Sequence, residues 1–327
     1  MKSKLFFFPS EPLSGYQNPY CNYFKASLSN YYEVLDMKKS SKCKRMFTLL
    51  VNSFKCDYII LNWLESVPFF PFGKVQFVLA LLSMVVLKLR KVKILFMFHD
   101  LIPHFGDNWM SRYLMKWLFA NSDLIITHSK EALDVAKQKT DKPCYYVCHP
   151  VHRTNVEPFE SNRQIDVFIW GAIYDYKGIY EFISLPSIQK SKLQIYILGH
   201  AKDEMLREKI QSQCNSHIMY EDRRADFTEI AACCKDSKYV LFPYIGESIS
   251  SSGALIDTLV FGGVPVGPNR GAFKDLAEEK ACLVYDNYNG LCELLNQNQT
   301  IHTDDREEFL DKYSWDNFVK LIYEKFH

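Results

Sequence analysis

The chain has 327 residues, of which 48% are hydrophobic and 15% aromatic, and its formal net charge is +1. This length suits about two domains, and the composition excludes a disordered chain, a fibre and a histone-like basic protein. The whole-chain charge conceals a split, because residues 1–158 carry a formal charge of +9 and residues 159–327 carry −8.

Short apolar runs alternate with helix-like segments through the first half, which predicts βαβ units and a parallel sheet. Strands are expected at 5–9, 32–37, 58–63, 94–99, 124–128 and 145–149. Helices are expected at 19–29, 44–54, 74–90, 108–121 and 130–139. A polar, proline-containing stretch at 150–163 is predicted to be a linker.

The uncharged segment from Val75 to Leu87 is shorter than the roughly 20 apolar residues that a membrane-spanning helix needs. We therefore expect a core helix packed between the sheet and its neighbours. A basic tail follows the segment and is suited to a peripheral contact with anionic lipid. This tail contains Lys88, Arg90, Lys91 and Lys93.

The start of the chain has no recognisable secretory signal. The ten cysteines include no CxxC pair, and most of them lie in apolar runs. Reduced thiols in a cytoplasmic protein are the expectation.

The alternation restarts after the linker and predicts a second parallel sheet. Strands are expected at 166–171, 193–199, 218–220, 239–243, 264–267 and 282–285. Helices are expected at 177–184, 202–213, 226–235, 252–262, 271–278, 288–296 and 314–326. Because doubly wound sheets bind ligands at the carboxyl ends of their strands, we expect the functional residues there.

Several catalytic signatures are absent from the sequence. There is no GxGxxG after the first strand of either half, and no GxxxxGK[ST], HExxH or GxSxG. Dinucleotide-dependent hydride transfer, P-loop hydrolysis, zinc proteolysis and esterase chemistry therefore lack sequence support. The basic residues of the first half are spread over several segments, which is not the pattern of a nucleic-acid-binding face.

A loop of small residues follows the expected strand 239–243 and leads into a helix that begins near Ser252. Small residues let backbone amides approach a ligand, and a helix N-terminus attracts negative charge, so a pyrophosphate fits there. A serine N-cap on an ordinary helix explains the same residues.

A second element, Trp-Gly-Ala-Ile-Tyr-Asp-Tyr-Lys-Gly at 170–178, opens the first helix of the second domain. A lysine at a helix start is unfavourable unless an anion lies nearby. Lys177 is therefore a candidate phosphate ligand, or else a solvated lysine after a turn.

Together these elements resemble the nucleotide-sugar-binding half of a GT-B glycosyltransferase from the family-4-like group (glycosyl transferases group 1). The resemblance covers residues 164–326 and rests on the order Gly…Lys-Gly, Leu-Gly-His, Pro-Tyr…Ser-Gly-Ala-Leu and Gly-Gly-Val-Pro-Val. The first domain matches in layout and in the run Phe-His-Asp-Leu-Ile-Pro-His at 98–104. The resemblance implies an α/β fold of two doubly wound, Rossmann-like domains facing one cleft.

The same resemblance implies the domain roles. Residues 1–158 would bind the acceptor, residues 159–313 the nucleotide-sugar donor, and the helix 314–327 would cross back to the first domain. The implied activity is transfer of a sugar to a glycan or lipid-linked glycan in surface polysaccharide biosynthesis, with retention. No DxD triplet is present, and a lysine with helix amides can neutralise a diphosphate, so we expect a metal-independent enzyme without a cofactor.

The resemblance also assigns residues. Lys177 and the amides of 251–254 would hold the diphosphate, Glu247 would lie beside the donor sugar, and His99 would lie near the reacting carbons. The expected donor-binding set is Gly171, Lys177, Gly199, Arg223, Tyr244, Ser250, Ser251, Ser252, Gly253, Ala254 and Asp257. The expected acceptor-binding set is Tyr16, Asn18 and His104, and the expected catalytic set is His99, Asp100 and Glu247.

Two positions depart from the pattern of the family. Many members have two glutamates eight positions apart, but Thr258 stands where the second is expected, so the ribose-binding carboxylate is missing or has moved to Asp257. An arginine usual five positions before the lysine is replaced by Ala172, whose missing charge Arg223 or Arg224 can supply.

Alternatives from other classes remain. Asp100 as a general base would imply inversion, and a capping aspartate with a structural histidine explains the pair 99–100 without catalysis. A UDP-sugar 2-epimerase has the same architecture but needs several charged residues around one sugar. A non-catalytic nucleotide-sugar-binding protein would keep Lys177 and the serine loop alone.

Overall fold

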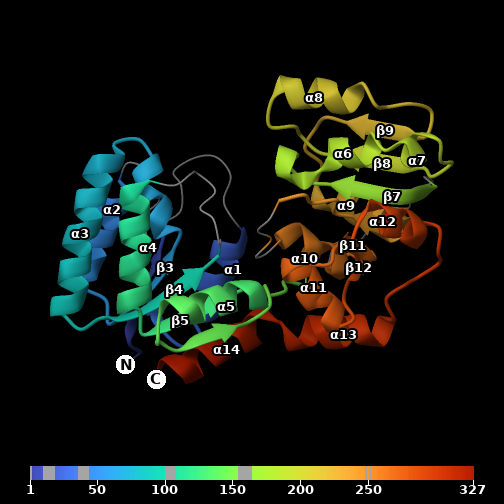
Figure 1. Ribbon diagram of the computed structural model, residues 1–327. Helices are drawn as coiled ribbons and strands as arrows, with labels where there is room; N and C mark the ends of the chain where they lie inside the picture. The colour runs from blue at the N-terminus through green and yellow to red at the C-terminus, as the bar shows by residue number, and fades with distance from the viewer. Residues whose placement is uncertain are drawn as a thin grey trace. The chain divides into compact units, whose positions relative to one another are not determined.

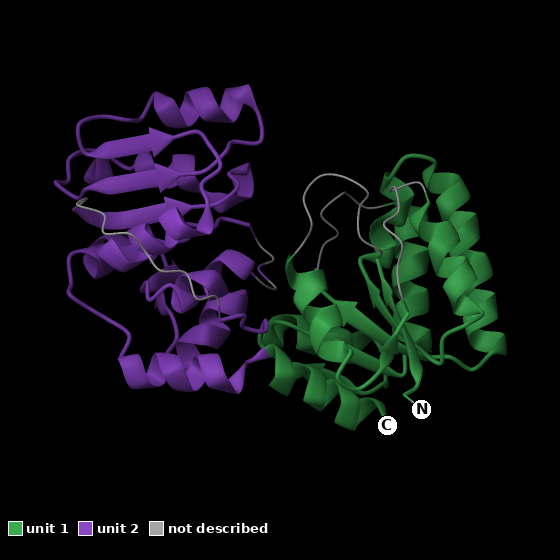
Figure 2. Cartoon of the chain, turned by 180° about the vertical axis from the view of Figure 1, so that it is seen from behind, with its two compact units in different colours: residues 1–148, 315–327 green, residues 149–314 purple. Residues whose placement is uncertain are grey.

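The computed structural model describes residues 2–9, 19–35, 44–99, 108–153, 164–246, 249 and 252–327. The chain divides into two units, which Figure 2 shows in different colours. Unit 1 contains residues 1–148 and 315–327, and unit 2 contains residues 149–314. Each unit has its own six-stranded sheet and therefore its own core.

The sheet of unit 1 has the strand order β2-β1-β3-β4-β5-β6, and all of its strand pairs are parallel. The strands are β1 (Lys4–Phe8), β2 (Glu33–Val34), β3 (Tyr58–Asn62), β4 (Lys93–Phe98), β5 (Leu124–Thr127) and β6 (Cys144–Tyr146). The helices are α1 (Pro19–Leu28), α2 (Arg45–Ser53), the 3-10 helix η1 (Leu64–Phe69), α3 (Gly73–Leu89), α4 (Trp109–Asn121), α5 (Lys130–Lys139) and α14 (Trp315–Phe326).

A parallel sheet is covered on both faces, so both sides of each central strand must be apolar. The continuous apolar runs of unit 1 meet this requirement and therefore form its central strands. Residues 5–8 of β1 and 94–98 of β4 are all at most 2% exposed. Helix α14 adds to this core from the other end of the chain. Its Trp315 ring lies 5.1 Å from Tyr20 and 5.5 Å from Phe24 of α1. The last helix is therefore part of unit 1.

The sheet of unit 2 has the strand order β12-β11-β10-β7-β8-β9 and is also parallel. The strands are β7 (Ile165–Trp170), β8 (Ile195–Leu198), β9 (Ile218–Glu221), β10 (Ser237–Leu241), β11 (Pro265–Pro268) and β12 (Leu283–Tyr285). The helices are η2 (Asp175–Lys177), α6 (Ile179–Ile183), α7 (Pro186–Gln189), α8 (Glu204–Gln211), α9 (Phe227–Asp236), α10 (Gly253–Val260), α11 (Gly271–Glu278), α12 (Tyr288–Leu295) and α13 (Thr303–Lys312).

The expected fold class, two doubly wound α/β domains, is confirmed, and all twelve expected strands are present within a few residues of their expected ends. The sequence analysis did not predict η1, α7 and α13. η1 and α7 are short and contain Pro68 and Pro186, which mask a helical pattern. The helix expected at 177–184 begins at Ile179, because Lys177 belongs to the turn before it.

The boundary between the units lies at residues 148 and 149, whereas the sequence analysis placed it at 158 and 159. Residues that follow Cys148 are tied to α13 and its end. The Val151 N–H donates to the Tyr313 carbonyl at 2.8 Å, and Arg153 forms ion pairs with Glu307 and Asp311, both at 2.7 Å. These contacts hold the beginning of the expected linker in unit 2, and residues 154–163 lie outside the described residues.

Helix α3 differs from the core helix that was expected between Val75 and Leu87. One face is buried, through residues that include Phe77, Ala80 and Met84. The opposite face is exposed, because no described segment of unit 1 covers it. Across the described ranges, no helix has the length and hydropathy to cross a membrane.

Candidate functional site

The loop from Gly171 to Gly178 lies at the carboxyl end of β7 and is fixed to the end of β10. The Tyr176 carbonyl accepts hydrogen bonds from the N–H groups of Ile245 and Gly246, at 2.9 and 3.2 Å. Gly178 has a φ of 64°, and a Cβ there would lie 2.2 Å from the Pro243 carbonyl oxygen. Only glycine fits this approach. The Lys-Gly pair therefore places Lys177 between two strand ends.

The Lys177 side chain is a buried cation, with the residue only 8% exposed. Its Nζ lies 5.6 Å from the centre of the Tyr244 ring and 3.6 Å from the position that a Cβ on Gly171 would take. Among the described residues, no carboxylate lies within ion-pair distance of this Nζ. Burial lowers the pKa of Lys177 to about 8. A buried charge without a counter-ion is costly, which points to an anionic ligand.

The N-terminus of α10 supplies hydrogen-bond donors near Tyr244, whose ring Lys177 contacts. Ser252 caps the helix by accepting from the Leu255 N–H at 3.3 Å, and its side chain lies beside that of Tyr244. No acceptor within the described ranges is recorded for the N–H groups of Gly253 and Ala254. A Cβ added at Gly253 would meet no heavy atom within 4 Å. Amides without an acceptor in the described ranges, open space beside Gly253 and a positive helix end together suit an anion.

Asp257 lies one helical turn after Gly253, so both residues face the same side of α10. Burial raises the pKa of the Asp257 carboxyl to about 7. Thr258, where the sequence analysis expected a glutamate, is fully buried, and its Oγ1 accepts a hydrogen bond from the Trp170 indole N–H at 3.1 Å. Thr258 is therefore part of the core of unit 2. Asp257 is the carboxylate on the side of α10 that also carries Gly253.

Replacing Asp257 with asparagine is expected to stabilise the ligand-free protein at pH 8. The folded-state pKa is about 7 and the unfolded value about 4, so the wild type loses stability as the pH rises through this interval. The variant should melt at the same temperature as the wild type near pH 4 and above it at pH 8. Thermal unfolding curves across this pH range measure the difference. A difference in melting temperature between the two proteins that stays the same from pH 4 to pH 8 would contradict the raised pKa of Asp257.

Gly199 and Arg223 follow β8 and β9. A Cβ on Gly199 would lie 1.9 Å from the Gly171 carbonyl oxygen, so this glycine lets the two loops touch. The Arg223 guanidinium is paired with Glu229 and Glu221, in the latter case at 2.7 Å. Phosphate binding by Arg223 would require the guanidinium to exchange these carboxylates for the ligand.

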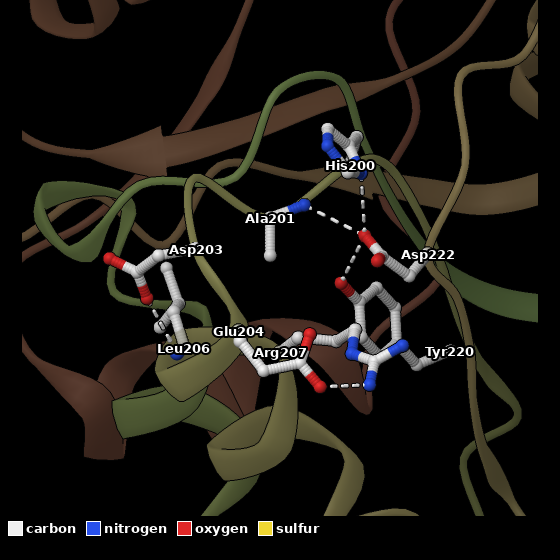
Figure 3. A network of polar contacts seen from close by, with 8 residues as sticks. All are labelled: His200, Ala201, Asp203, Glu204, Leu206, Arg207, Tyr220 and Asp222. Atoms are coloured by element: carbon white, nitrogen blue, oxygen red, sulfur yellow. Dashed lines mark hydrogen bonds and ion pairs between the residues drawn. The ribbon is translucent and has the colours of Figure 1, made fainter.

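Asp222 ties the loop after β8 to the loop after β9. Figure 3 shows its Oδ1 accepting from the Ala201 N–H at 2.8 Å, the Tyr220 hydroxyl at 3.0 Å and His200 Nδ1 at 3.2 Å. Partial burial alone would raise the pKa of Asp222, but these hydrogen bonds lower it overall. The ionised carboxylate therefore orders the strand ends beside Gly199.

In unit 1, His99 lies at the carboxyl end of β4 and is buried. Its ring stacks on Trp63, with centroids 4.4 Å apart, and its Nε2 is 2.9 Å from Asn62 Oδ1. The Asn62 amide donates its Nδ2 hydrogen to the Phe8 carbonyl at 2.7 Å, which fixes Oδ1 as an acceptor. His99 therefore carries its proton on Nε2, and Asn62 sets the plane of the ring.

A second histidine lies beside His99, with ring centroids 5.4 Å apart. His128 Nδ1 is 2.8 Å from the Val147 carbonyl, which can only accept, so Nδ1 carries the proton. Its Nε2 then accepts from the Tyr20 hydroxyl at 2.9 Å. Tyr20 meets the edge of both histidine rings. The sequence analysis did not bring Tyr20, Asn62, Trp63 or His128 together with His99.

The remaining expected site residues lie outside the described residues. They are Tyr16, Asn18, Asp100, His104, Glu247, Ser250 and Ser251. Their assignments stay predictions.

The sequence analysis also missed a cavity of about 350 Å³ beside Tyr244, a size typical of ligand pockets. Arg270, after β11, donates from one terminal nitrogen to the Tyr244 carbonyl at 3.0 Å. The buried Arg270 Nε and Tyr288 hydroxyl have no hydrogen-bond partner in the described ranges. An arginine two residues after an apolar strand was the available signal.

No family model and no curated protein sequence matches this chain. Solved structures do match. HepE from Anabaena in complex with UDP-glucose is 12% identical, with 98% of each chain covered and a TM-score of 0.71. AviGT4, a glycosyltransferase of avilamycin A biosynthesis, is 10% identical, with 99% of this chain and 97% of that chain covered and a TM-score of 0.66.

An E. coli trehalose-6-phosphate structure with bound UDP-2-fluoro glucose is 11% identical, with 99% of each chain covered and a TM-score of 0.68. These chains have the GT-B fold, and the similarity extends over both units. The chain described above has the GT-B fold.

Proposed function

We propose that this protein is a glycosyltransferase that moves a hexose from a nucleotide-sugar donor to a glycan or lipid-linked glycan acceptor. Unit 2 binds the donor and unit 1 the acceptor, and the enzyme acts in surface polysaccharide biosynthesis. The donor is a co-substrate, and neither a metal nor another cofactor takes part.

The observation that carries this proposal is the position of Lys177. A buried ammonium without a carboxylate partner in the described ranges lies beside Tyr244, whose hydroxyl meets the cap of α10. The N–H groups of Gly253 and Ala254 provide the second set of donors. A diphosphate bridges a point charge and a helix N-terminus and neutralises both without a metal ion.

His99 is the proposed positioning residue for the donor sugar. Its Nε2 proton is engaged with Asn62, and stacking on Trp63 fixes the plane of the ring at the carboxyl end of β4. We propose retention, in which the bond between the sugar C1 and the diphosphate oxygen breaks, the acceptor oxygen attacks C1 from the same face, and the leaving phosphate takes the proton of the acceptor hydroxyl. Lys177 and the α10 amides stabilise the negative charge that develops on the leaving group.

The structural neighbours support a nucleotide-sugar donor. Two of them, HepE and the E. coli structure, are complexes with UDP-glucose and UDP-2-fluoro glucose. UDP is therefore the first nucleotide to test. The positive charge of residues 1–158 favours an acceptor that carries phosphate, as lipid-linked glycans do.

Donor consumption with and without acceptor tests the proposed reaction. We expect release of nucleoside diphosphate only when acceptor is present, and the same rate in excess EDTA. An epimerase would convert the donor without acceptor, and a binding protein would leave it intact. Activity that EDTA abolishes and manganese restores would contradict the metal-independent site.

A further inference from the structure

Helix α3 is apolar on its exposed face as well as on its buried face. Five outward residues, Val75, Val78, Leu82, Val85 and Leu89, are each between 49% and 79% exposed. Their spacing of three and four residues places them on one stripe, about 21 Å long at 1.5 Å per residue. A helix that is apolar all round is normally covered on every side, but α3 is covered on one side only.

Helix α2 packs against α3 and carries a second exposed apolar stripe. Phe47, Val51 and Phe54 follow one another at spacings of four and three residues and are all exposed. Figure 1 shows α2 and α3 side by side in unit 1. We call these eight residues the α2–α3 face. So many neighbouring exposed apolar side chains mark an interaction surface.

The helices of this face carry charges of a single sign, although the exposed Asp57 follows α2. The sequences of α2, α3 and α4 contain no aspartate or glutamate. Lys55, Lys74, Lys88 and Lys91 are exposed near the ends of α2 and α3. Two other basic residues of the expected tail have structural partners, because Arg90 donates to the Ser53 and Cys56 carbonyls, both at 3.1 Å, and Lys93 pairs with Asp123 at 3.0 Å.

We propose that the α2–α3 face docks on an anionic lipid bilayer, with its apolar side chains in the interface and its lysines at the phosphates. An amphipathic surface of this kind lies in the membrane plane rather than crossing the bilayer. A second copy of the chain is a poorer occupant, because a two-fold contact would bring the same lysines together without any carboxylate from these helices. This inference rests on the proposed function in one respect, which is that the docked membrane would carry the lipid-linked acceptor.

Flotation of the full-length protein with vesicles tests this docking. The probes are pure phosphatidylcholine vesicles and vesicles with one quarter phosphatidylglycerol. We expect binding to the anionic vesicles at about 0.1 M salt and loss of most of that binding at about 1 M, where charges are screened over about 3 Å. Equal binding to both vesicle types, or none at low salt, would overturn the proposal.

Two substitutions separate the apolar and the charged contributions. Leu82→Asp puts a carboxylate in the middle of the stripe, and the pair Lys88→Glu and Lys91→Glu reverses the sign at its end. Each should lower the bound fraction at least tenfold. Matched controls lie in unit 2, where Met205→Asp alters an equally exposed apolar residue and Lys209→Glu with Lys235→Glu reverses two exposed lysines. These controls should bind vesicles as the wild type does.

The same proteins also test whether a second copy of the chain covers the face, and they separate failure of the docking proposal from failure of the proposed function. Analytical ultracentrifugation without lipid should show that the wild-type protein is a monomer. A wild-type dimer that dissociates in the Leu82→Asp variant would assign the face to a second copy of the chain and overturn the membrane proposal. UDP titration of Leu82→Asp should match the wild type, because the donor site lies in unit 2. Vesicle binding without any nucleotide binding would reject the proposed function and leave the docking surface standing.

Discussion

Replacing Lys177 with methionine should weaken binding of UDP about 100-fold while making the ligand-free protein more stable at pH 7. Methionine keeps an apolar stem of similar length but removes the charge. Because Lys177 is buried without a carboxylate partner in the described ranges, its protonated form destabilises the ligand-free fold. A hydrogen bond between charged groups contributes up to about 3 kcal/mol, and about 1.4 kcal/mol corresponds to a factor of ten in affinity.

The pH dependence of both effects follows from the pKa of about 8. Below pH 8 the folded protein holds the buried charge, so the stability gain of the variant is largest there, and it should disappear as the pH approaches the unfolded value of about 10.4. UDP affinity of the wild type should fall as the pH rises above 8. Calorimetric titration and thermal unfolding measure the two quantities.

Lys192→Met is the matched control for this substitution. Lys192 is an exposed lysine before β8 in the same unit. It should bind UDP as the wild type does. If Lys177→Met binds UDP normally, or if it is less stable than the wild type at pH 7, the lysine is a structural residue and the proposed donor site is wrong.

Gly253→Val should abolish measurable UDP binding and leave the fold intact. The first helical residue of α10 presents its N–H to the candidate anion site, and a branched side chain there would hold a phosphate away from the amides. The protein itself has room for the change, because a Cβ at this position meets no heavy atom within 4 Å. Titration with UDP and a far-UV circular dichroism spectrum measure binding and folding.

Gly290→Val is the matched control, because it makes the same substitution at the start of another helix. Gly290 also lies in the first turn of a helix in unit 2, and a Cβ there meets only Asn287 Oδ1 at 3.9 Å. Both variants should lose a similar small amount of stability. The Gly290→Val variant should still bind UDP, whereas the Gly253→Val variant should not. Normal binding in Gly253→Val would mean that the Ser252 turn is only a helix cap.

The sheets could be predicted from the sequence because fully covered parallel strands are unbroken apolar runs. Residues 5–8 and 94–98 show this pattern without ambiguity. The exposed face of α3 could not be predicted, since periodicity detects a polar face and this helix has none. The attachment of residues 151–153 to α13 could not be predicted, because the contacts of Arg153 join residues 154 to 158 positions apart in the chain, which no local pattern reports.

The donor side of the site was predictable only in part. Gly171, Lys177 and Ser252 stand next to recognisable strand and helix ends, so their proximity follows from parallel topology. Arg223 looked like an available cation, yet its partner Glu229 lies on the following helix. The hydrogen bond between Tyr20 and His128 joins residues 108 positions apart. Such pairings depend on the packing of side chains, which composition and spacing do not encode.

Calorimetric titration of UDP into the wild-type protein in the presence of EDTA tests the central claim most directly. The account predicts saturable binding with one site per chain, unchanged by added manganese and lost in Gly253→Val. No heat of binding from UDP or any other nucleoside diphosphate, or binding that appears only with manganese, would contradict it.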